Sequence, residues 1–204
     1  MADLTVVNYG LGNVQAFVHI YRRLNIVVKV ASTAEQLSDA KKIILPGVGS
    51  FDWAITRLQD SGMRDVLDEM VVSKKVPVLG VCVGMQIMVN NSEEGKLKGL
   101  GWVNGVVKKF RSAATVDTPL PHMGWNDVLP TDSRDLFRNI KKARYYFLHS
   151  YCVELSDSKD VLATTEYSAN FISAIRSGKI YGTQFHPEKS HCSGVELLRN
   201  FAEI

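Results

Sequence analysis

Residues 77–86 read Pro-Val-Leu-Gly-Val-Cys-Val-Gly-Met-Gln, and this stretch decides the fold. An apolar segment, predicted to be a strand, runs into Gly80-Val81-Cys82-Val83-Gly84, and an apolar segment able to form a helix follows. This is the layout of a nucleophile elbow with cysteine in place of serine. The two glycines allow the close backbone approach of a sharp turn, where a Cβ atom would clash. The turn also puts the sulfur at a helix N-terminus, whose partial positive charge favours a thiolate.

A candidate base lies far downstream, in the run Gln184-Phe185-His186-Pro187-Glu188 after another expected strand. Cys82, His186 and Glu188, in this order, indicate a thiol acyl-transfer enzyme. Each part alone is a weak signal, because a lone cysteine after a strand is usually a small buried hydrophobe and a His-Pro-Glu run is often a turn. The conjunction of elbow, spacing and downstream histidine favours catalysis.

Composition points to one globular domain over residues 1–204, with 46% hydrophobic and 22% charged residues. The net charge of +3 comes from lysines and arginines in scattered short pairs, which is not typical of a nucleic-acid surface. The three cysteines suggest neither a disulfide framework nor a metal site. Since we find no signal peptide and no apolar run of about 20 residues, we expect a cytoplasmic protein without a membrane partner.

Strand and helix signals alternate over the first 81 residues and predict parallel βαβ units. Strands are expected at 4–8, 26–30, 42–45 and 76–81, and helices at 14–24, 33–37, 51–59 and 63–72. Beyond residue 100 strand signals dominate, which predicts an antiparallel extension or a mixed flank of the sheet. These strands are expected at 103–110, 125–129, 145–149, 161–167, 171–176 and 179–185, with a loop at 117–121 and a closing helix at 195–202.

The first turn contains Gly10-x-Gly12, which is the beginning of a dinucleotide-binding fingerprint. The third glycine of that fingerprint would stand at position 15, where the chain has Gln15. We therefore interpret the glycines as a tight turn and expect no cofactor.

Five blocks spread over the chain resemble those of class I, triad-type glutamine amidotransferases. They are Asn8-Tyr9-Gly10-Leu11-Gly12-Asn13, Leu45-Pro46-Gly47-Val48-Gly49, Gly80-Val81-Cys82-Val83-Gly84-Met85-Gln86, Pro121-His122-Met123-Gly124-Trp125-Asn126 and Gln184-Phe185-His186-Pro187-Glu188-Lys189-Ser190. The second and fourth blocks narrow the resemblance to the glutaminase subunits of imidazole glycerol phosphate synthase. The resemblance implies an α/β, flavodoxin-like fold with a mixed, mostly parallel central sheet flanked by helices.

The resemblance also implies roles for the residues. Cys82 would attack the side-chain amide of L-glutamine, giving a γ-glutamyl thioester and then glutamate, while His186 transfers protons and Glu188 orients His186. The oxyanion would be held by the backbone N–H groups of Val83 and Val48, the latter after a peptide flip. From the residues alone, the Pro46–Gly49 segment is better interpreted as a plain turn at a strand end.

Glutamine binding by the same resemblance involves Gly49, Gln86 and Glu94, with backbone groups of Ser150 and Tyr151. Glu94 would hold the substrate ammonium group, and Gln86 its α-carboxylate or its amide. Gln86 follows Cys82 by four residues, a spacing that puts both on one helix face.

The partner implied by the resemblance is a HisF-type (β/α)8 cyclase in a heterodimer. It would receive ammonia and make imidazole glycerol phosphate and AICAR in histidine biosynthesis. The residues expected to face it are Asn13, His122, Trp125, Tyr146 and Lys189. From the residues alone, Trp125 and Tyr146 are equally well interpreted as core aromatics.

Other functions compete with this one. Val83 stands where the family usually has leucine, and a paralogue supplying ammonia to a HisF-like partner in surface-polysaccharide sugar amidation remains open. The complete set of Cys82, His186 and Glu188 disfavours a non-enzymatic module, and the Pro121–Asn126 block disfavours a cysteine peptidase.

Overall fold

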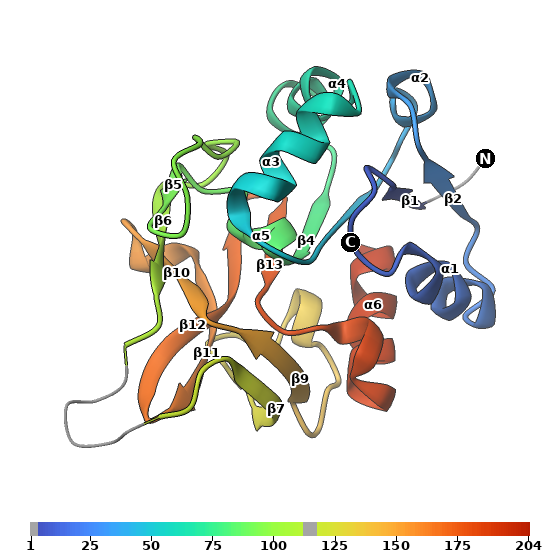
Figure 1. The fold of residues 1–204 in the computed structure, drawn as a ribbon. Coiled ribbons are helices and arrows are strands. Elements are labelled where there is room, and N and C mark those ends of the chain that lie inside the picture. Colours follow the sequence, from blue (N-terminus) through green and yellow to red (C-terminus); the bar gives the residue numbers. More distant parts are fainter. Residues whose placement is uncertain (1–3, 112–117) are drawn as a thin grey trace.

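The computed structural model describes residues 4–111 and 118–204. Within them, eleven strands form one mixed sheet and two further strands form an antiparallel pair (Figure 1). The strands of the large sheet are β1 (Leu4–Val7), β2 (Val28–Ala31), β3 (Ile43–Gly47), β4 (Val78–Cys82), β5 (Asn91–Ser92), β6 (Gly105–Lys109), β8 (Leu129–Pro130), β10 (Tyr151–Leu155), β11 (Val161–Tyr167), β12 (Ala169–Ser177) and β13 (Ile180–Thr183). The separate pair is β7 (His122–Asp127) and β9 (Arg144–His149).

Helices form at all five ranges expected from the apolar spacing, with ends that differ by up to four residues, and a further short helix follows the elbow. They are α1 (Val14–Arg23), α2 (Ala34–Leu37), α3 (Phe51–Asp60), α4 (Arg64–Asp68), which continues into a π-helical turn (Glu69–Ser73), α5 (Val83–Gln86) and α6 (His191–Glu203). Short 3-10 turns lie at Asp135–Phe137, Ser158–Asp160 and Pro187–Lys189. Of the loop expected at 117–121, Asp117 lies outside the described residues and 118–121 form neither helix nor strand. No helix in the described ranges is long and apolar enough to cross a membrane.

The large sheet joins a parallel half to an antiparallel half. Its order is β2-β1-β3-β4-β13-β12-β10-β6-β5, and the first five strands run parallel. From β13 onward the pairs β13–β12, β12–β10 and β10–β6 are antiparallel. The predicted α/β class with a mixed central sheet is confirmed. The predicted predominance of strands after residue 100 is confirmed as well.

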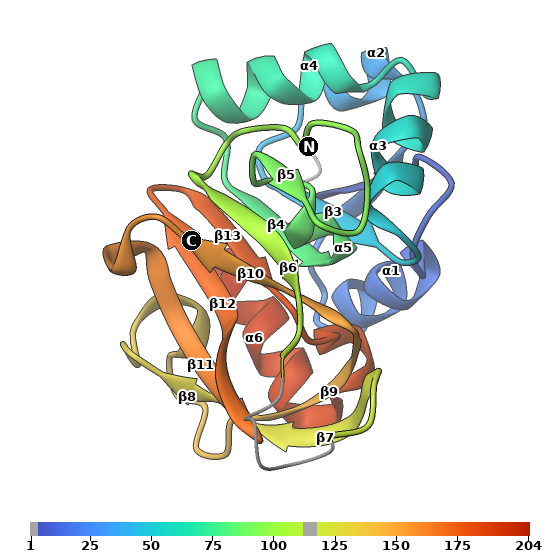
Figure 2. The same cartoon turned by 60° about the vertical axis from the view of Figure 1, so that its left-hand side comes forward.

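Helices cover both faces of the parallel half. Figures 1 and 2 show α1 and α6 together on one face, and α2, α3 and α4 on the other. Because both faces are covered, β1, β3 and β4 are buried along their whole length, as their continuous apolar sequences require. Because β3, β4 and β13 are parallel neighbours, their C-terminal ends lie side by side at one end of the sheet.

The first turn packs against the end of β3. Gly10 and Gly12 have φ of +93° and +84°, which confirms the interpretation of a tight turn. A Cβ atom on Gly12 would lie 2.5 Å from the ring of Pro46, and the buried hydroxyl of Tyr9 donates a 2.7 Å hydrogen bond to the carbonyl of Pro46. The turn thus anchors the end of β3, while Asn13 accepts from the Ala16 N–H and precedes the first residue of α1.

The β7–β9 pair has one inward and one outward face. Its register sets His122 opposite His149 and Trp125 opposite Tyr146. His122 and His149 are buried, whereas Trp125 is 39% exposed. The alternative that makes Trp125 a core aromatic is therefore wrong.

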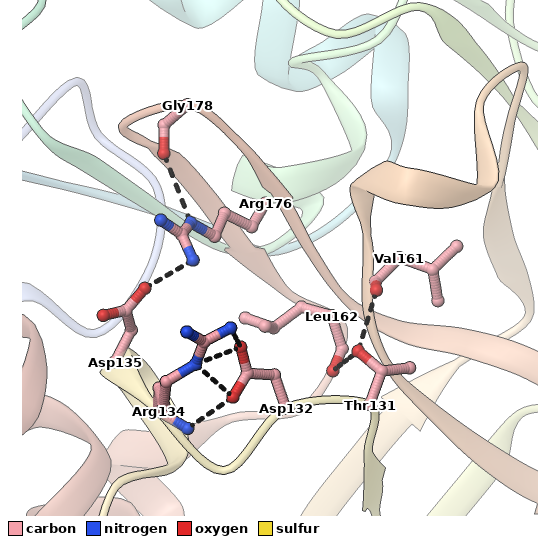
Figure 3. A network of polar contacts seen from close by, with 8 residues as sticks. All are labelled: Thr131, Asp132, Arg134, Asp135, Val161, Leu162, Arg176 and Gly178. Atoms are coloured by element: carbon pink, nitrogen blue, oxygen red, sulfur yellow. Dashed lines mark hydrogen bonds and ion pairs between the residues drawn. The ribbon is translucent and has the colours of Figure 1, made fainter.

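A separate ionic network fastens the segment after β8 to the antiparallel half. Figure 3 shows Arg176, on β12, paired with Asp135 and donating to the carbonyl of Gly178, while Asp132 accepts from Arg134. The hydroxyl of Thr131 donates to the strand carbonyls at the start of β11. These contacts are partly exposed, so we assign them a structural role.

Candidate active site

Cys82 lies at a strained turn between β4 and α5. Its φ of 56° and ψ of −115° lie in a region that residues with a Cβ atom rarely occupy. A Cβ atom on Gly84 would lie 2.0 Å from the carbonyl oxygen of Leu45, and one on Gly80 would lie 2.6 Å from the carbonyl oxygen of Gly84. The close backbone approach predicted for both glycines is present.

The helix after the turn is shorter than the sequence suggests. α5 contains only Val83–Gln86 and ends at Ile87. A single turn has a small dipole, so the predicted helix-terminus stabilisation of a thiolate is reduced. What remains is the N–H of Val83, which opens the helix and has no intrahelical acceptor.

His186 and Glu188 lie in the turn after β13, and His186 lines the same cavity as Cys82. His186 Nδ1 lies 2.8 Å from Glu188 Oε1, and both side chains are 3% exposed. Burial lowers the pKa of His186, but hydrogen bonds to Cys82 and Glu188, reinforced by their charges, outweigh it and raise the pKa to about 10. His186 therefore carries a proton at neutral pH.

Strand β9 holds this turn in place. The His186 N–H donates to the carbonyl of Tyr146 at 2.9 Å. The hydroxyl of Ser190 accepts from the Tyr146 N–H at 3.0 Å and donates to the carbonyl of His186 at 2.6 Å. The position of the imidazole is thus tied to the β7–β9 pair.

A cavity of about 270 Å³ opens over Cys82, near the lower end for small-molecule sites. It is lined by Val48, Gly49, Cys82, Val83, Gln86, Glu94, Pro121, Leu148, His149, Ser150, Tyr151 and His186. All the residues expected in the oxyanion hole and the glutamine site lie on this wall. Their individual roles stay predictions.

The sequence interpretation missed three contributors. Leu148 and His149 line the cavity from the end of β9, and the carbonyl of Leu148 lies 3.9 Å from Cys82 Sγ. Gln184 is fully buried and its Nε2 lies 3.8 Å from the same sulfur. The position of Gln184, two residues before the histidine, is the signal that could have drawn attention to it.

Two polar side chains of the cavity are already held by the protein. Gln86 Nε2 donates to the carbonyl of Tyr151 and to Gln184 Oε1, both at 3.0 Å. Its two N–H bonds are used, so only its oxygen can meet a ligand, which favours the amide N–H over the α-carboxylate among the two predicted contacts. Glu94 accepts from the Phe51 N–H at 2.8 Å, which fixes its carboxylate at the cavity wall.

The segment after β3 borders the cavity with Val48 and Gly49. Gly49 has a φ of +88°, but a Cβ atom on Gly47 would lie 2.1 Å from the backbone nitrogen of Gly84. Gly47, the last residue of β3, is thus required for close packing against the elbow. Val48, between them, is 39% exposed.

Four of the five residues expected at a partner interface reach the surface, and one does not. Asn13, Trp125 and Lys189 are exposed and Tyr146 is half-buried. Lys189 Nζ lies 5.8 Å from the ring centre of Tyr146. His122, by contrast, is only 2% exposed, so its expected place at an interface is wrong, because β7 turns that side chain toward the core.

Comparisons with known proteins agree with this geometry. Residues 5–204 match the family described as "Glutamine amidotransferase class-I". The chain is 52% identical to the "Imidazole glycerol phosphate synthase subunit HisH" of Bdellovibrio bacteriovorus, covering 98% of this chain and 100% of the relative. It is 48% identical to the protein of the same name from Leptospira borgpetersenii, covering 98% of each.

Solved structures show the same fold at low sequence identity. A crystal structure described as glutamine amidotransferase superposes with a TM-score of 0.76 at 19% identity, covering 98% of this chain and 97% of that one. PurLQS from Thermotoga maritima gives 0.71 at 16% identity, with the same coverage.

Proposed function

The chain belongs to the class I glutamine amidotransferases, and from this membership we propose that it is the glutaminase subunit of an imidazole glycerol phosphate synthase. The observation that carries the proposal is that the strained, elbow-borne Cys82 shares the wall of a small cavity with His186, which is buried in a pair with Glu188. The substrate is L-glutamine, and the products are glutamate and ammonia.

Cys82 is the nucleophile in this proposal. The thiolate attacks the side-chain amide carbon of glutamine, and the tetrahedral intermediate expels ammonia to leave a γ-glutamyl thioester. His186, protonated and buried next to the sulfur, delivers the proton that the leaving nitrogen needs. Water then attacks the thioester, with the now neutral His186 taking its proton, and releases glutamate and the thiolate.

Glu188 and two backbone groups complete the machinery. Glu188, 2.8 Å from Nδ1, keeps the other ring nitrogen of His186 directed at the sulfur. The N–H of Val83 is the first oxyanion donor, and the N–H of Val48 is the second once its peptide points into the cavity. Each donor of this kind contributes about 2.7–4 kcal/mol to transition-state stabilisation.

The proposed partner is a HisF-type (β/α)8 cyclase, bound as a heterodimer over the mouth of the cavity. The support is an exposed apolar surface on the outer face of β7–β9, formed by Met123, Trp125 and Leu148 beside the half-buried Tyr146. Leu148 belongs both to this surface and to the cavity wall, so a docked subunit would enclose the site where ammonia forms. Ammonia kept from water stays unprotonated and able to react.

Sugar amidation with a HisF-like partner is the less favoured alternative. Relatives at 48–52% identity over nearly the whole chain are named as subunits of imidazole glycerol phosphate synthase, which supports the histidine pathway.

The deciding experiment measures glutamate release by the purified chain alone, with a HisF-type cyclase, and with cyclase plus its ribonucleotide substrate. We expect release to rise in this order and imidazole glycerol phosphate to form. Release that this cyclase fails to stimulate would retain the amidotransferase chemistry and move the assignment to another partner.

The hydroxyl of Tyr9 offers a test of the segment after β3. Tyr9→Phe leaves the carbonyl of Pro46 without its donor, and we expect the free energy of unfolding to fall by about 1–3 kcal/mol. Because Pro46 precedes the proposed oxyanion peptide by two residues, kcat should fall as well. Tyr21→Phe is the matched control, since the Tyr21 hydroxyl makes a similar buried bond to Leu198 far from the cavity. Equal kcat for the two variants would refute the role of Tyr9.

Trp125 offers a test of the docking surface. Trp125→Ala removes a large aromatic from this surface, and we expect the Kd for the cyclase to rise by about 30-fold, as for an interface hot spot. The control is Val72→Ala, an exposed apolar residue in the π-helical turn after α4. Titration calorimetry of both variants measures the effect, and an unchanged Kd for Trp125→Ala would exclude this face as the interface.

A further inference from the structure

A chain of hydrogen bonds joins the half-buried Asn126 to the buried side chains of His122 and His149, the last of which lines the cavity. Asn126 Nδ2 lies 3.4 Å from His122 Nε2, and His122 Nδ1 lies 3.0 Å from His149 Nε2. His149 Nδ1 lies 3.0 Å from the carbonyl of Tyr151. The chain therefore leads from β7 across to β9 and ends at a backbone carbonyl of the cavity wall.

Both ends of the chain determine where the protons lie. At one end a carbonyl can only accept, so His149 Nδ1 carries the hydrogen. At the other end Asn126 Nδ2 also donates to the carbonyl of Glu166 at 2.8 Å, while Asn126 Oδ1 accepts from the Asp127 N–H. Asn126 therefore presents its second N–H to His122, whose Nε2 accepts. Both histidines are then Nδ1–H tautomers, each passing one hydrogen bond toward Tyr151.

The surroundings keep both rings neutral. Burial lowers the pKa of His149 to about 3, assisted by its neighbour His122, and burial lowers that of His122 to about 4. A proton on His149 Nε2 would face the N–H of His122, which the 3.0 Å separation does not allow. His149 thus stays uncharged although it shares the cavity with the protonated His186.

The carbonyl of Tyr151 is where this chain meets the proposed catalytic residues. It accepts both from His149 Nδ1 and from Gln86 Nε2. Gln86 in turn donates to Gln184, whose Nε2 lies 3.8 Å from Cys82 Sγ. With both lone pairs occupied by the protein, this carbonyl holds the β10 end of the cavity wall to the helix that follows the nucleophile.

We propose that His149, held as its Nδ1–H tautomer by His122, is a positioning residue that fixes the Tyr151 carbonyl and, through it, Gln86 in the glutamine site. The effect on glutamine rests on the proposed function, whereas the hydrogen-bond chain does not. His149 acts by donating one hydrogen bond and remaining neutral; it takes no part in proton transfer to the substrate.

Nuclear magnetic resonance tests the chain of hydrogen bonds and requires no measurement of enzyme activity. Two-bond proton–nitrogen spectra of histidine-labelled protein distinguish the two neutral tautomers and the charged ring. We expect His122 and His149, assigned from the His122→Asn and His149→Asn spectra, to be neutral Nδ1–H tautomers near neutral pH. An Nε2–H tautomer or a charged ring at either position would overturn the proposal.

Enzyme kinetics tests how the chain of hydrogen bonds affects the binding of glutamine. His149→Leu removes the donor, and we expect KM for glutamine to rise about tenfold with a smaller change in kcat. His149→Asn places an N–H near the position of Nδ1, so it should recover most of the loss. His19→Leu, an exposed histidine on α1, should behave as wild type.

The outcomes separate the proposal from the function on which it rests. Equal KM values for wild type and His149→Leu, or equal losses for the Leu and Asn variants, would contradict a positioning role. If the wild type releases no glutamate with any partner, the proposed function fails. The tautomer spectra then still decide whether the chain of hydrogen bonds from Asn126 to Tyr151 exists. If His149→Leu does not fold, the comparison of His149→Asn with wild type and the spectra decide together.

Discussion

Replacing Cys82 by alanine is expected to lower kcat for glutamate release by about 10⁴- to 10⁶-fold, as when a triad nucleophile is removed. No sulfur is left to form the thioester. Alanine keeps the Cβ atom and the strained backbone of the elbow, so the fold and the cavity remain. Glutamate release by the complex with the cyclase measures the loss, and urea unfolding checks that stability is retained.

The other two cysteines provide controls for this result. Cys192 is exposed at the start of α6, and Cys192→Ala should retain full activity. Cys152 is buried, and burial together with Glu154 and Glu93 raises the pKa of its thiol to about 11, so it cannot replace the lost thiolate. A decrease of less than about 100-fold in Cys82→Ala would exclude covalent catalysis by this residue.

The elbow could be predicted from the sequence because its cause is local. A glycine on each side of Cys82 is required by contacts that arise within one turn and with the adjacent β3, and the apolar strand before it is evident in ten residues. The alternation of strands and helices over the first half was predictable for the same reason, since each amphipathic or apolar period is visible by itself.

What the sequence could not show depends on pairing between distant strands. The family resemblance implied that His122 faces a partner, and only the pairing of β7 with β9 shows that this side chain turns inward. β10 was missed since it follows β9 after a single residue, without a turn signal. The contacts of Gln184 and His149 join segments that are far apart in sequence, so no local pattern announces them.

Replacing Glu188 by glutamine is expected to lower kcat/KM by about 10²- to 10⁴-fold while the geometry persists. The glutamine oxygen can still accept from His186 Nδ1, but the negative charge that supports the imidazolium is lost. The basic limb of the pH profile of kcat/KM reports the proton on His186. We expect it near the pKa of about 10 in the wild type and at lower pH in the variant, where the hydrogen bond to Cys82 alone raises the pKa. An identical basic limb in both proteins would contradict the role of Glu188.

Stability gives an independent measure of the same pair. The folded protein keeps the His186 proton up to about pH 10, whereas the unfolded chain releases it near 6.5. The contribution of His186 is therefore fully present below pH 6.5 and is lost as the pH rises toward 10, because in that range the folded state retains the His186 proton and the unfolded chain does not. In Glu188→Gln the folded pKa is lower, so the loss should be smaller and end at a lower pH. Urea unfolding at a series of pH values measures this slope, and an equal slope in both proteins would show that Glu188 does not hold the proton.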